Sequence, residues 1–411
     1  MRRPPLRLLA RFRALLGPDA AGARQSLTAL GLSTLTSLAA GAALGAITGT
    51  LEALPGLLVL VPASIGMRGN IFGALGSRLS TSIHTGTFGL SRRADTVVGQ
   101  NVMASIILTL VTAVALAGIA KTVAVALGLR GTISVLDLVV ISVVGAVLSS
   151  VVVLAFTLAL AAGSVRYGWD LDNVTAPLVG SVGDVVGLPS LWLASLLVGL
   201  GAFTDIVGTV LLAAGLAALV AGLRSGLGLL VRILRESVPI LCLAGLISIV
   251  AGISIEKRLD TFTALPALLV LLPAFLGAAG ALGGILANRL SSKIHLGVVR
   301  VSAVPGREAR TDIVFVVALA VPVFVLNAVV AEVAAALLGV ASPGLDRLVA
   351  ASLVGGLVAI GLVVLIAYYG TIAAVRLGLD PDTYGIPVVT SSVDLVGSFA
   401  LIFAIVALGI V

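Results

Sequence analysis

The chain has 411 residues, of which 59% are hydrophobic and only 10% are charged, and its formal net charge is +7. An ordinary soluble domain carries about 25% charged residues, so this composition excludes a soluble globular protein. It predicts an all-α polytopic membrane protein whose solvent is the lipid bilayer. The positive charge does not indicate a nucleic-acid partner, because no basic face with interleaved aromatic residues is present and aromatic residues make up only 4%.

The first 23 residues form a basic N-terminal segment. Its positive side chains are Arg2, Arg3, Arg7, Arg11 and Arg13. A secretory signal needs an apolar core, which this segment lacks. We expect it to lie in the cytoplasm or on the membrane surface.

The rest of the chain contains an internal repeat. At an offset of 211 residues the matching positions include Pro62 and Pro273, Gly66 and Gly277, Arg78 and Arg289, and His84 and His295. At an offset of 210 they include Asp170 and Asp380, Asp184 and Asp394, and Gly187 and Gly397. These matches predict a first membrane repeat at 24–201, a linker at 202–234 and a second membrane repeat at 235–411.

Each repeat is expected to have five membrane spans. In the first repeat these are 27–50, 53–90, 97–127, 133–163 and 177–201, and the second of them is interrupted by proline and glycine. The apolar stretch 203–222 has no counterpart and predicts a linker transmembrane helix, which makes about eleven spans. Five spans plus one return the chain to its starting side. The two repeats should therefore be parallel and related by a pseudo-twofold axis.

The loops carry a charge bias that predicts the topology. With a cytoplasmic N-terminus, most lysines and arginines fall in cytoplasmic loops, as the positive-inside rule requires. The C-terminus is then extracellular, and the plasma membrane is the expected location. Because the two repeats already form a pseudo-dimer, a single chain is expected to suffice.

Two acidic residues, Asp184 and Asp394, lie well inside the fifth span of each repeat. A carboxylate at such depth costs about 2.5–3.5 kcal/mol on insertion scales, so it usually faces a cavity, a partner or an ion path. In a parallel pseudo-dimer the two would meet and repel unless a cation lay between them. Mg²⁺ suits such a sparse pair, because it is commonly held by one or two carboxylates while it retains water. A helix-capping or interhelical hydrogen bond is the structural alternative.

Further polar residues surround these two aspartates. Small or hydroxyl-bearing positions in the same spans are Ser181, Gly183, Thr390 and Ser391, and acidic or amide positions just ahead of them are Asp170, Asp172, Asn173, Asp380 and Asp382. The acidic group could concentrate cations at a cytoplasmic pore mouth. It could equally consist of ordinary helix N-caps, and the two roles are compatible.

The interrupted second span is another candidate. Proline and glycine inside a span free backbone carbonyls, which together with Asn70 could contact a hydrated cation. Close helix packing through small residues is the alternative. His84 and His295, one in each repeat, make a poor metal site, and a cytoplasmic interfacial role is favoured for them. Cys242 is the single cysteine, so neither a disulfide nor a cysteine metal site is available.

Two stretches resemble a known family. The pattern Pro62 to Asn70, followed by 77–81, resembles the second-helix signature of the MgtE membrane domain, and the stretches 170–184 and 390–394 resemble its fifth-helix motif. The duplication is similar to that of the family's solute-carrier branch. The resemblance implies a pore between two five-helix units, with hydrated magnesium bound by Asp184 and Asp394.

The chain departs from this family pattern at several places. Ala281 stands where the motif has asparagine, and Arg68 and Ala279 break its usual small or neutral pattern, so the two repeats are not expected to contribute equally. No stretch is long and polar enough to form the cytoplasmic sensor domains of bacterial relatives.

The predicted function is transport of a divalent cation, most specifically Mg²⁺, with Mn²⁺ or another divalent ion as a further candidate. The alternative is a secondary carrier of another small solute, for which Arg68 would be the midplane positive charge. An intramembrane enzyme is disfavoured, because no span combines a nucleophile with a histidine or cysteine partner.

Overall fold

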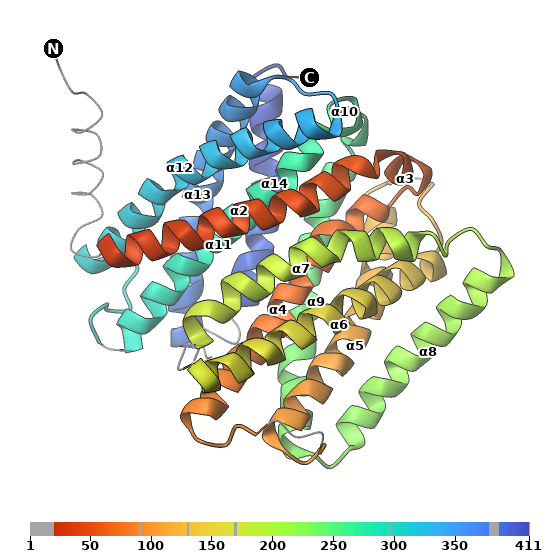
Figure 1. Ribbon diagram of the computed structural model, residues 1–411, viewed down its shortest axis with the longest axis vertical. Coiled ribbons are helices and arrows are strands. Elements are labelled where there is room, and N and C mark those ends of the chain that lie inside the picture. The colour runs from red at the N-terminus through yellow and green to blue at the C-terminus, as the bar shows by residue number, and fades with distance from the viewer. Residues whose placement is uncertain are drawn as a thin grey trace. The chain divides into compact units, whose positions relative to one another are not determined.

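The computed structural model describes residues 20–89, 93–129, 131–167, 171–295, 297–377 and 386–410. Within the helices, the side chains of 20–29, 32, 84, 171–177, 288, 291–292, 295, 386 and 388 are outside this description. Every regular element among the described residues is a helix (Figure 1). The first half contains α2 (Ala20–Ala46), α3 (Thr48–Ala53), α4 (Leu57–His84), α5 (Val97–Ala126), α6 (Val135–Tyr167), α7 (Leu171–Ser195) and α8 (Ala202–Arg224). The second half contains α9 (Gly228–Glu256), α10 (Leu259–Ala264), α11 (Ala267–His295), α12 (Arg307–Leu338), α13 (Leu345–Arg376) and α14 (Ile386–Ala407).

Ten of the described helices, α4 to α9 and α11 to α14, are long and apolar enough to cross a membrane. Helices suit this environment because hydrocarbon offers no partner for a backbone N–H or C=O group, and a helix pairs these groups internally. The all-α, multi-pass architecture is therefore confirmed. The apolar stretch 203–222 lies within α8, which is confirmed as a helix of spanning length, and only 17% of its apolar window is buried.

The predicted interruption of the second span is wrong. Helix α4 runs without a break through Pro62, and α11 does the same through Pro273. Proline removes one N–H donor from a helix, and within a packed bundle the helix tolerates that loss. The chain instead bends just before α4, at Gly56, whose φ of 97° is a left-handed conformation that glycine adopts without strain.

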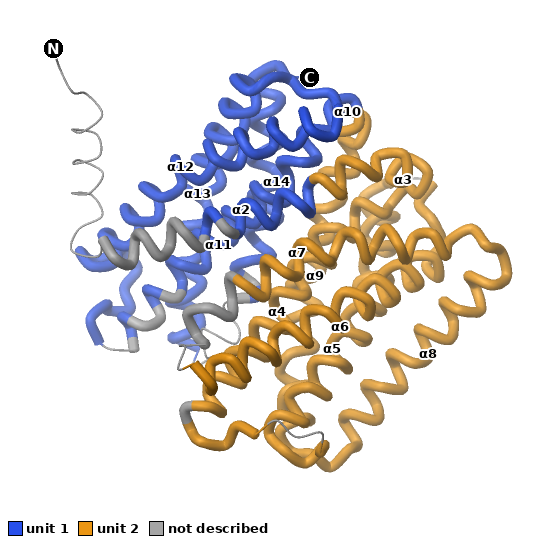
Figure 2. The backbone as a smooth tube through the Cα atoms, in the orientation of Figure 1, with its two compact units in different colours: residues 1–41, 264–411 blue, residues 42–263 orange. Residues whose placement is uncertain are grey.

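The chain forms two compact units, and each mixes helices from both halves of the sequence (Figure 2). One unit joins α2, up to Gly41, with α11, α12, α13 and α14. The other unit contains α4 to α8 together with α9. Helix α9 packs there against α4 and α5. The first helix of each sequence repeat thus belongs to the unit built from the remaining helices of the other repeat.

Glycines allow α2 to approach α11 closely, and α9 to approach α4. A Cβ atom on Gly41 of α2 would lie 2.0 Å from the carbonyl oxygen of Val270 in α11. A Cβ atom on Gly252 of α9 would lie 2.3 Å from the carbonyl oxygen of Val59 in α4. Gly252 matches Gly41 at the repeat offset of 211 residues, and Val270 matches Val59 at the same offset. Equivalent glycines therefore make equivalent contacts in the two units.

Hydrogen bonds also hold the exchanged helices. In one unit, the Thr34 hydroxyl of α2 donates to the Asn327 side-chain oxygen of α12 at 2.8 Å, and both side chains are buried. In the other, the buried Glu256 carboxylate at the end of α9 accepts the Gly56 N–H at 2.8 Å, immediately before α4. A negative charge at a helix N-terminus is favourable because it meets unpaired N–H groups and the positive end of the helix dipole.

Polar side-chain contacts join the C-terminal end of α4 to α5 and the C-terminal end of α11 to α12. Asp312 of α12 is fully buried and accepts from Arg289 Nε at 2.8 Å and Lys293 Nζ at 2.7 Å, both on α11. At the matching place in the first half, Arg78 Nε donates to the Asn101 side-chain oxygen at 2.7 Å. These arginines therefore have a structural role. His84 and His295 end α4 and α11, and their side chains lie outside the description.

We expect Gly252→Ala to destabilise the protein by about 2 kcal/mol, because the new methyl group must displace backbone at Val59. Thermal unfolding in detergent measures the change. The control is Gly118→Ala in α5, where no atom lies within 4 Å of the added carbon and alanine should be neutral or slightly stabilising. Equal melting temperatures for the two variants would contradict the close approach of α9 and α4.

Asp312→Ala should cost roughly 3 kcal/mol of stability, because it leaves two partly buried cations, Arg289 and Lys293, without their carboxylate. Asn101→Ala removes one hydrogen bond and should cost about 1 kcal/mol. The same unfolding measurement compares the two variants. A larger loss for Asn101→Ala would be inconsistent with the ion pairs.

Candidate functional site: a carboxylate in the last helix of each repeat

Asp184 lies in the middle of α7, a helix that packs against α4 and α6. The span Leu178–Ser195 is apolar, and its carboxylate is only half-buried while Gly183 and Gly187 on either side are buried. Ser181, one turn earlier, is 5% exposed. The fold thus holds an acidic side chain at membrane depth on a helix whose adjoining face is made of small residues.

Asp394 occupies the matching place in α14, which packs against α11 and α13. It too is half-buried, and the pattern of buried and half-buried positions from 391 to 398 repeats that from 181 to 188. Ser391 is 2% exposed, and the Thr390 hydroxyl donates to the Pro387 carbonyl at 3.1 Å. Both aspartates have further polar or electrostatic interactions within the structure.

A positive side chain lies next to Asp184. Arg68 of α4 is 3% exposed, and Asp184 stabilises its charge electrostatically. The guanidinium lies against α7, since a Cβ atom on Gly187 would be 2.7 Å from Arg68 Nη1. This arginine was expected near the middle of its span, but its proximity to Asp184 was not anticipated from the sequence.

The equivalent helix contact beside Asp394, in the other unit, is apolar. A Cβ atom on Gly397 would lie 2.8 Å from Leu276 Cδ2, where Gly187 instead meets Arg68. The two aspartates therefore have similar burial along their own helices but different surroundings across the helix contact.

The other sequence-predicted residues are only partly placed. Asn70 is 7% exposed on α4, in the same unit as Asp184. Gly183 is buried, with a Cβ position 3.5 Å from Arg68 Cβ. Of the acidic group ahead of the fifth span, Asp170, Asp380 and Asp382 lie outside the described residues, and Asp172 and Asn173 belong to α7 but their side chains lie outside the description.

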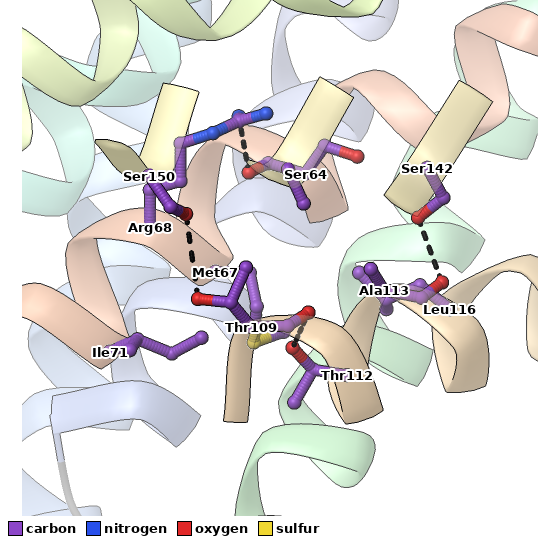
Figure 3. Close-up of a pocket in the computed structure, with 11 residues that line it drawn as sticks. Ser64, Met67, Arg68, Ile71, Thr109, Thr112, Ala113, Leu116, Ser142 and Ser150 are labelled. Carbon is purple, nitrogen blue, oxygen red and sulfur yellow. Dashed lines mark hydrogen bonds between the residues drawn. The ribbon is translucent and has the colours of Figure 1, made fainter. Parts of the chain in front are cut away.

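A polar cluster that sequence reasoning missed lies beside Arg68 (Figure 3). It surrounds a cavity of about 20 Å³, room for roughly one water molecule. Its hydroxyl-bearing residues are Ser64, Thr109, Thr112, Ser142 and Ser150. The signal was present as hydroxyl residues in the first repeat at places where the second repeat has mainly apolar residues.

The described part of the chain has few side chains that could coordinate a metal ion directly. No three His, Cys, Asp or Glu side chains gather into a metal-binding group anywhere in that part of the chain. A single carboxylate flanked by hydroxyl groups suits a cation that keeps most of its hydration water, which is the manner in which Mg²⁺ is commonly bound.

Comparison with known protein families gives a match in both halves of the chain. The MgtE family model, described as a divalent cation transporter, matches residues 61–194 and 272–404. These segments begin 211 residues apart and end 210 apart, the offsets of the internal repeat. Each of the two segments contains one of the aspartates.

Two curated relatives are similar to the chain. "Solute carrier family 41 member 3" of Rattus norvegicus is 28% identical over 258 residues, which cover 58% of this chain and 52% of the relative. The protein of the same name from Mus musculus is 30% identical over 147 residues, 34% of this chain and 29% of the relative. The chain thus spans about half the length of the first and less than a third of the second. No solved structure matches the chain.

The family model covers more than half of the chain, in two segments that overlap α4 to α7 and α11 to α14. Members of this family are transporters and not enzymes. The chain belongs to the MgtE family of divalent cation transporters.

Proposed function

We propose that this chain moves Mg²⁺ across the membrane and that Asp184 and Asp394 bind the hydrated ion along its path. The observation that carries the proposal is that each family-matched segment has one aspartate at the same depth of its last helix. Family membership supports a divalent cation in general. The finer assignment rests on the chemistry of the two carboxylates.

The cost of burying a carboxylate supports a role in ion binding. The spans Leu178–Ser195 and Val389–Ala407 are apolar, and a carboxylate near the centre of such a span costs about 2.5–3.5 kcal/mol on insertion scales. A helix needs no acidic residue there for its own stability. A cation that neutralises the negative charge during transport explains why both matched segments have an aspartate there despite this cost.

Hard oxygen ligands favour Mg²⁺. The ion dehydrates reluctantly and prefers one or two carboxylates with the remaining positions filled by water, so the hydroxyl groups of Ser181, Thr390 and Ser391 suit its hydration shell better than direct coordination. Asn70 and the residues Gly183, Asp170, Asp172, Asn173, Asp380 and Asp382 are proposed to line the path or its cytoplasmic mouth. Mn²⁺ accepts the same ligands and is the main competitor.

A carrier of anionic solutes is disfavoured by the environment of Arg68. Its Nη1 donates to the Ser64 carbonyl at 2.6 Å and its Nε donates to the Ser149 hydroxyl. With these donors directed to protein acceptors and Asp184 adjacent, the guanidinium is poorly arranged to bind an anion.

The proposed topology places the N-terminus in the cytoplasm and the C-terminus outside, in the plasma membrane. The distribution of basic residues among loops supports this orientation. With two parallel repeats in one chain, a single chain would supply both aspartates, and transport would need no second subunit.

Replacing either carboxylate should reduce transport. In liposomes loaded with a Mg²⁺-sensitive dye, we expect Asp184→Asn and Asp394→Asn each to lower the initial rate of Mg²⁺ entry at least about tenfold, because the neutral amide loses the charge that attracts the ion. Asp205→Asn is the matched control, since this aspartate lies exposed in the first turn of α8. Wild-type rates in both Asp184→Asn and Asp394→Asn, with normal assembly, would reject the proposal.

A further inference from the structure

Arg68 is fixed in the middle of α4 by acceptors on two helices. Its Nη1 donates to the Ser64 carbonyl one turn earlier at 2.6 Å, and its Nε donates to the Ser149 hydroxyl of α6. Nη2 lies 3.5 Å from the Gly145 carbonyl, also on α6. Figure 3 shows the guanidinium at the Ser64 carbonyl, beside the hydroxyl-lined cavity. A charged side chain at this depth is costly, and these acceptors and the polar cavity reduce that cost.

The same side chain lies across the face of α7 that carries Asp184. Gly183 and Gly187 precede and follow the aspartate, and added Cβ atoms there would lie 3.5 Å from Arg68 Cβ and 2.7 Å from Arg68 Nη1. The glycines thus leave the room that the arginine occupies. Asp184 in turn stabilises the arginine's charge electrostatically.

The second repeat builds the equivalent packing without an arginine. Ala279 stands at the position matching Arg68, and Val393 stands where the first repeat has Gly183. In the first repeat the larger residue is on α4 and the small one on α7, whereas in the second repeat the small residue is on α11 and the larger one on α14. Nearby, Phe275 matches Ser64, and its ring packs against that of Phe324 at a tilt of 41°, with ring centroids 5.0 Å apart. The second repeat thus forms the matching helix contact without a positive side chain, so the charge of Arg68 needs an explanation of its own.

We propose that Arg68 is a resident counter-charge for Asp184 that weakens cation binding at this carboxylate and makes the two aspartates functionally unequal. The inference rests on the proposed function, in which Asp184 contacts the transported ion. A cation approaching Asp184 must share the carboxylate with the guanidinium and is repelled by it. Weaker binding has a use, since an ion that is transported must also leave its site.

Removing the positive charge should strengthen cation binding. We expect Arg68→Gln to lower the half-saturating Mg²⁺ concentration for entry into liposomes roughly tenfold or more. A second variant, Arg68→Ala combined with Gly183→Val, should have the same effect. It carries the residues that the second repeat has at these two positions, and it replaces Arg68→Gln in the test if glutamine alone disturbs folding. Mg²⁺-dependent thermal stabilisation in detergent provides a second measure of affinity that does not depend on transport.

Two controls separate charge from packing. Arg68→Lys keeps the charge while losing the bond to Ser149, and Ser149→Ala removes that bond while leaving the arginine. Both should stay within about threefold of wild type in half-saturating Mg²⁺. A shift as large as that of Arg68→Gln in these controls would show a structural role and overturn the proposal, as would an unchanged Mg²⁺ affinity in Arg68→Gln.

A reciprocal variant transfers the counter-charge to the second repeat. Ala279→Arg combined with Val393→Gly should raise the half-saturating Mg²⁺ concentration, and an unchanged value would count against the proposal. Failure of the proposed function has a different signature, since transport would then persist in Asp184→Asn and Asp394→Asn. If those variants lose transport but Arg68→Gln leaves Mg²⁺ affinity unchanged, only the role of Arg68 is rejected.

Discussion

The structure depends on the high cost of placing charged and polar groups in hydrocarbon. In the ten spanning helices that the structure describes, helical hydrogen bonds pair most of the backbone groups, and several charged side chains lie beside a group of opposite charge. Arg68 lies beside Asp184, and Asp312 accepts from Arg289 and Lys293. Because composition leaves so few charges inside the spans, each one that is present points to a packing contact or to the ion path.

The two halves of the chain share several helix contacts but differ in the side chains around the two aspartates. Equivalent glycines bring α2 against α11 and α9 against α4, and equivalent serines bond the preceding long helix: Ser142 to the Ala113 carbonyl and Ser352 to the Phe324 carbonyl. Around the aspartates the halves diverge, with Arg68 and hydroxyl groups in one unit and Phe275, Phe324 and Val393 in the other. A duplicated chain can change one half while the other retains the original chemistry, which a dimer of identical chains cannot do.

Much of the fold was predictable from the sequence, because length and hydropathy determine what can span a bilayer. The spans of the long helices, the extra helix α8 and the depth of both aspartates follow from apolar runs and the internal repeat. The exchange of α2 and α9 between the units did not follow, since these helices are apolar on most faces and their periodicity does not select a partner.

Local sequence rules also failed at particular residues. Pro62 and Pro273 were expected to interrupt their helices, yet packing holds both helices continuous. Arg68 was recognised as unusual, but its position against Gly183 and Gly187 required the geometry of α4 on α7. The hydroxyl cluster was visible only as a difference between the two repeats, and its spatial convergence depends on the packing of three helices.

The central proposal is that the carboxylates of Asp184 and Asp394 bind the transported cation. Equilibrium Mg²⁺ binding to the purified protein, measured by titration calorimetry on wild type and on the double variant Asp184→Asn with Asp394→Asn, tests it most directly. We predict saturable binding in the wild type and its loss in the double variant, while the melting temperature in the absence of Mg²⁺ is retained. Undiminished Mg²⁺ affinity in a folded double variant would contradict it.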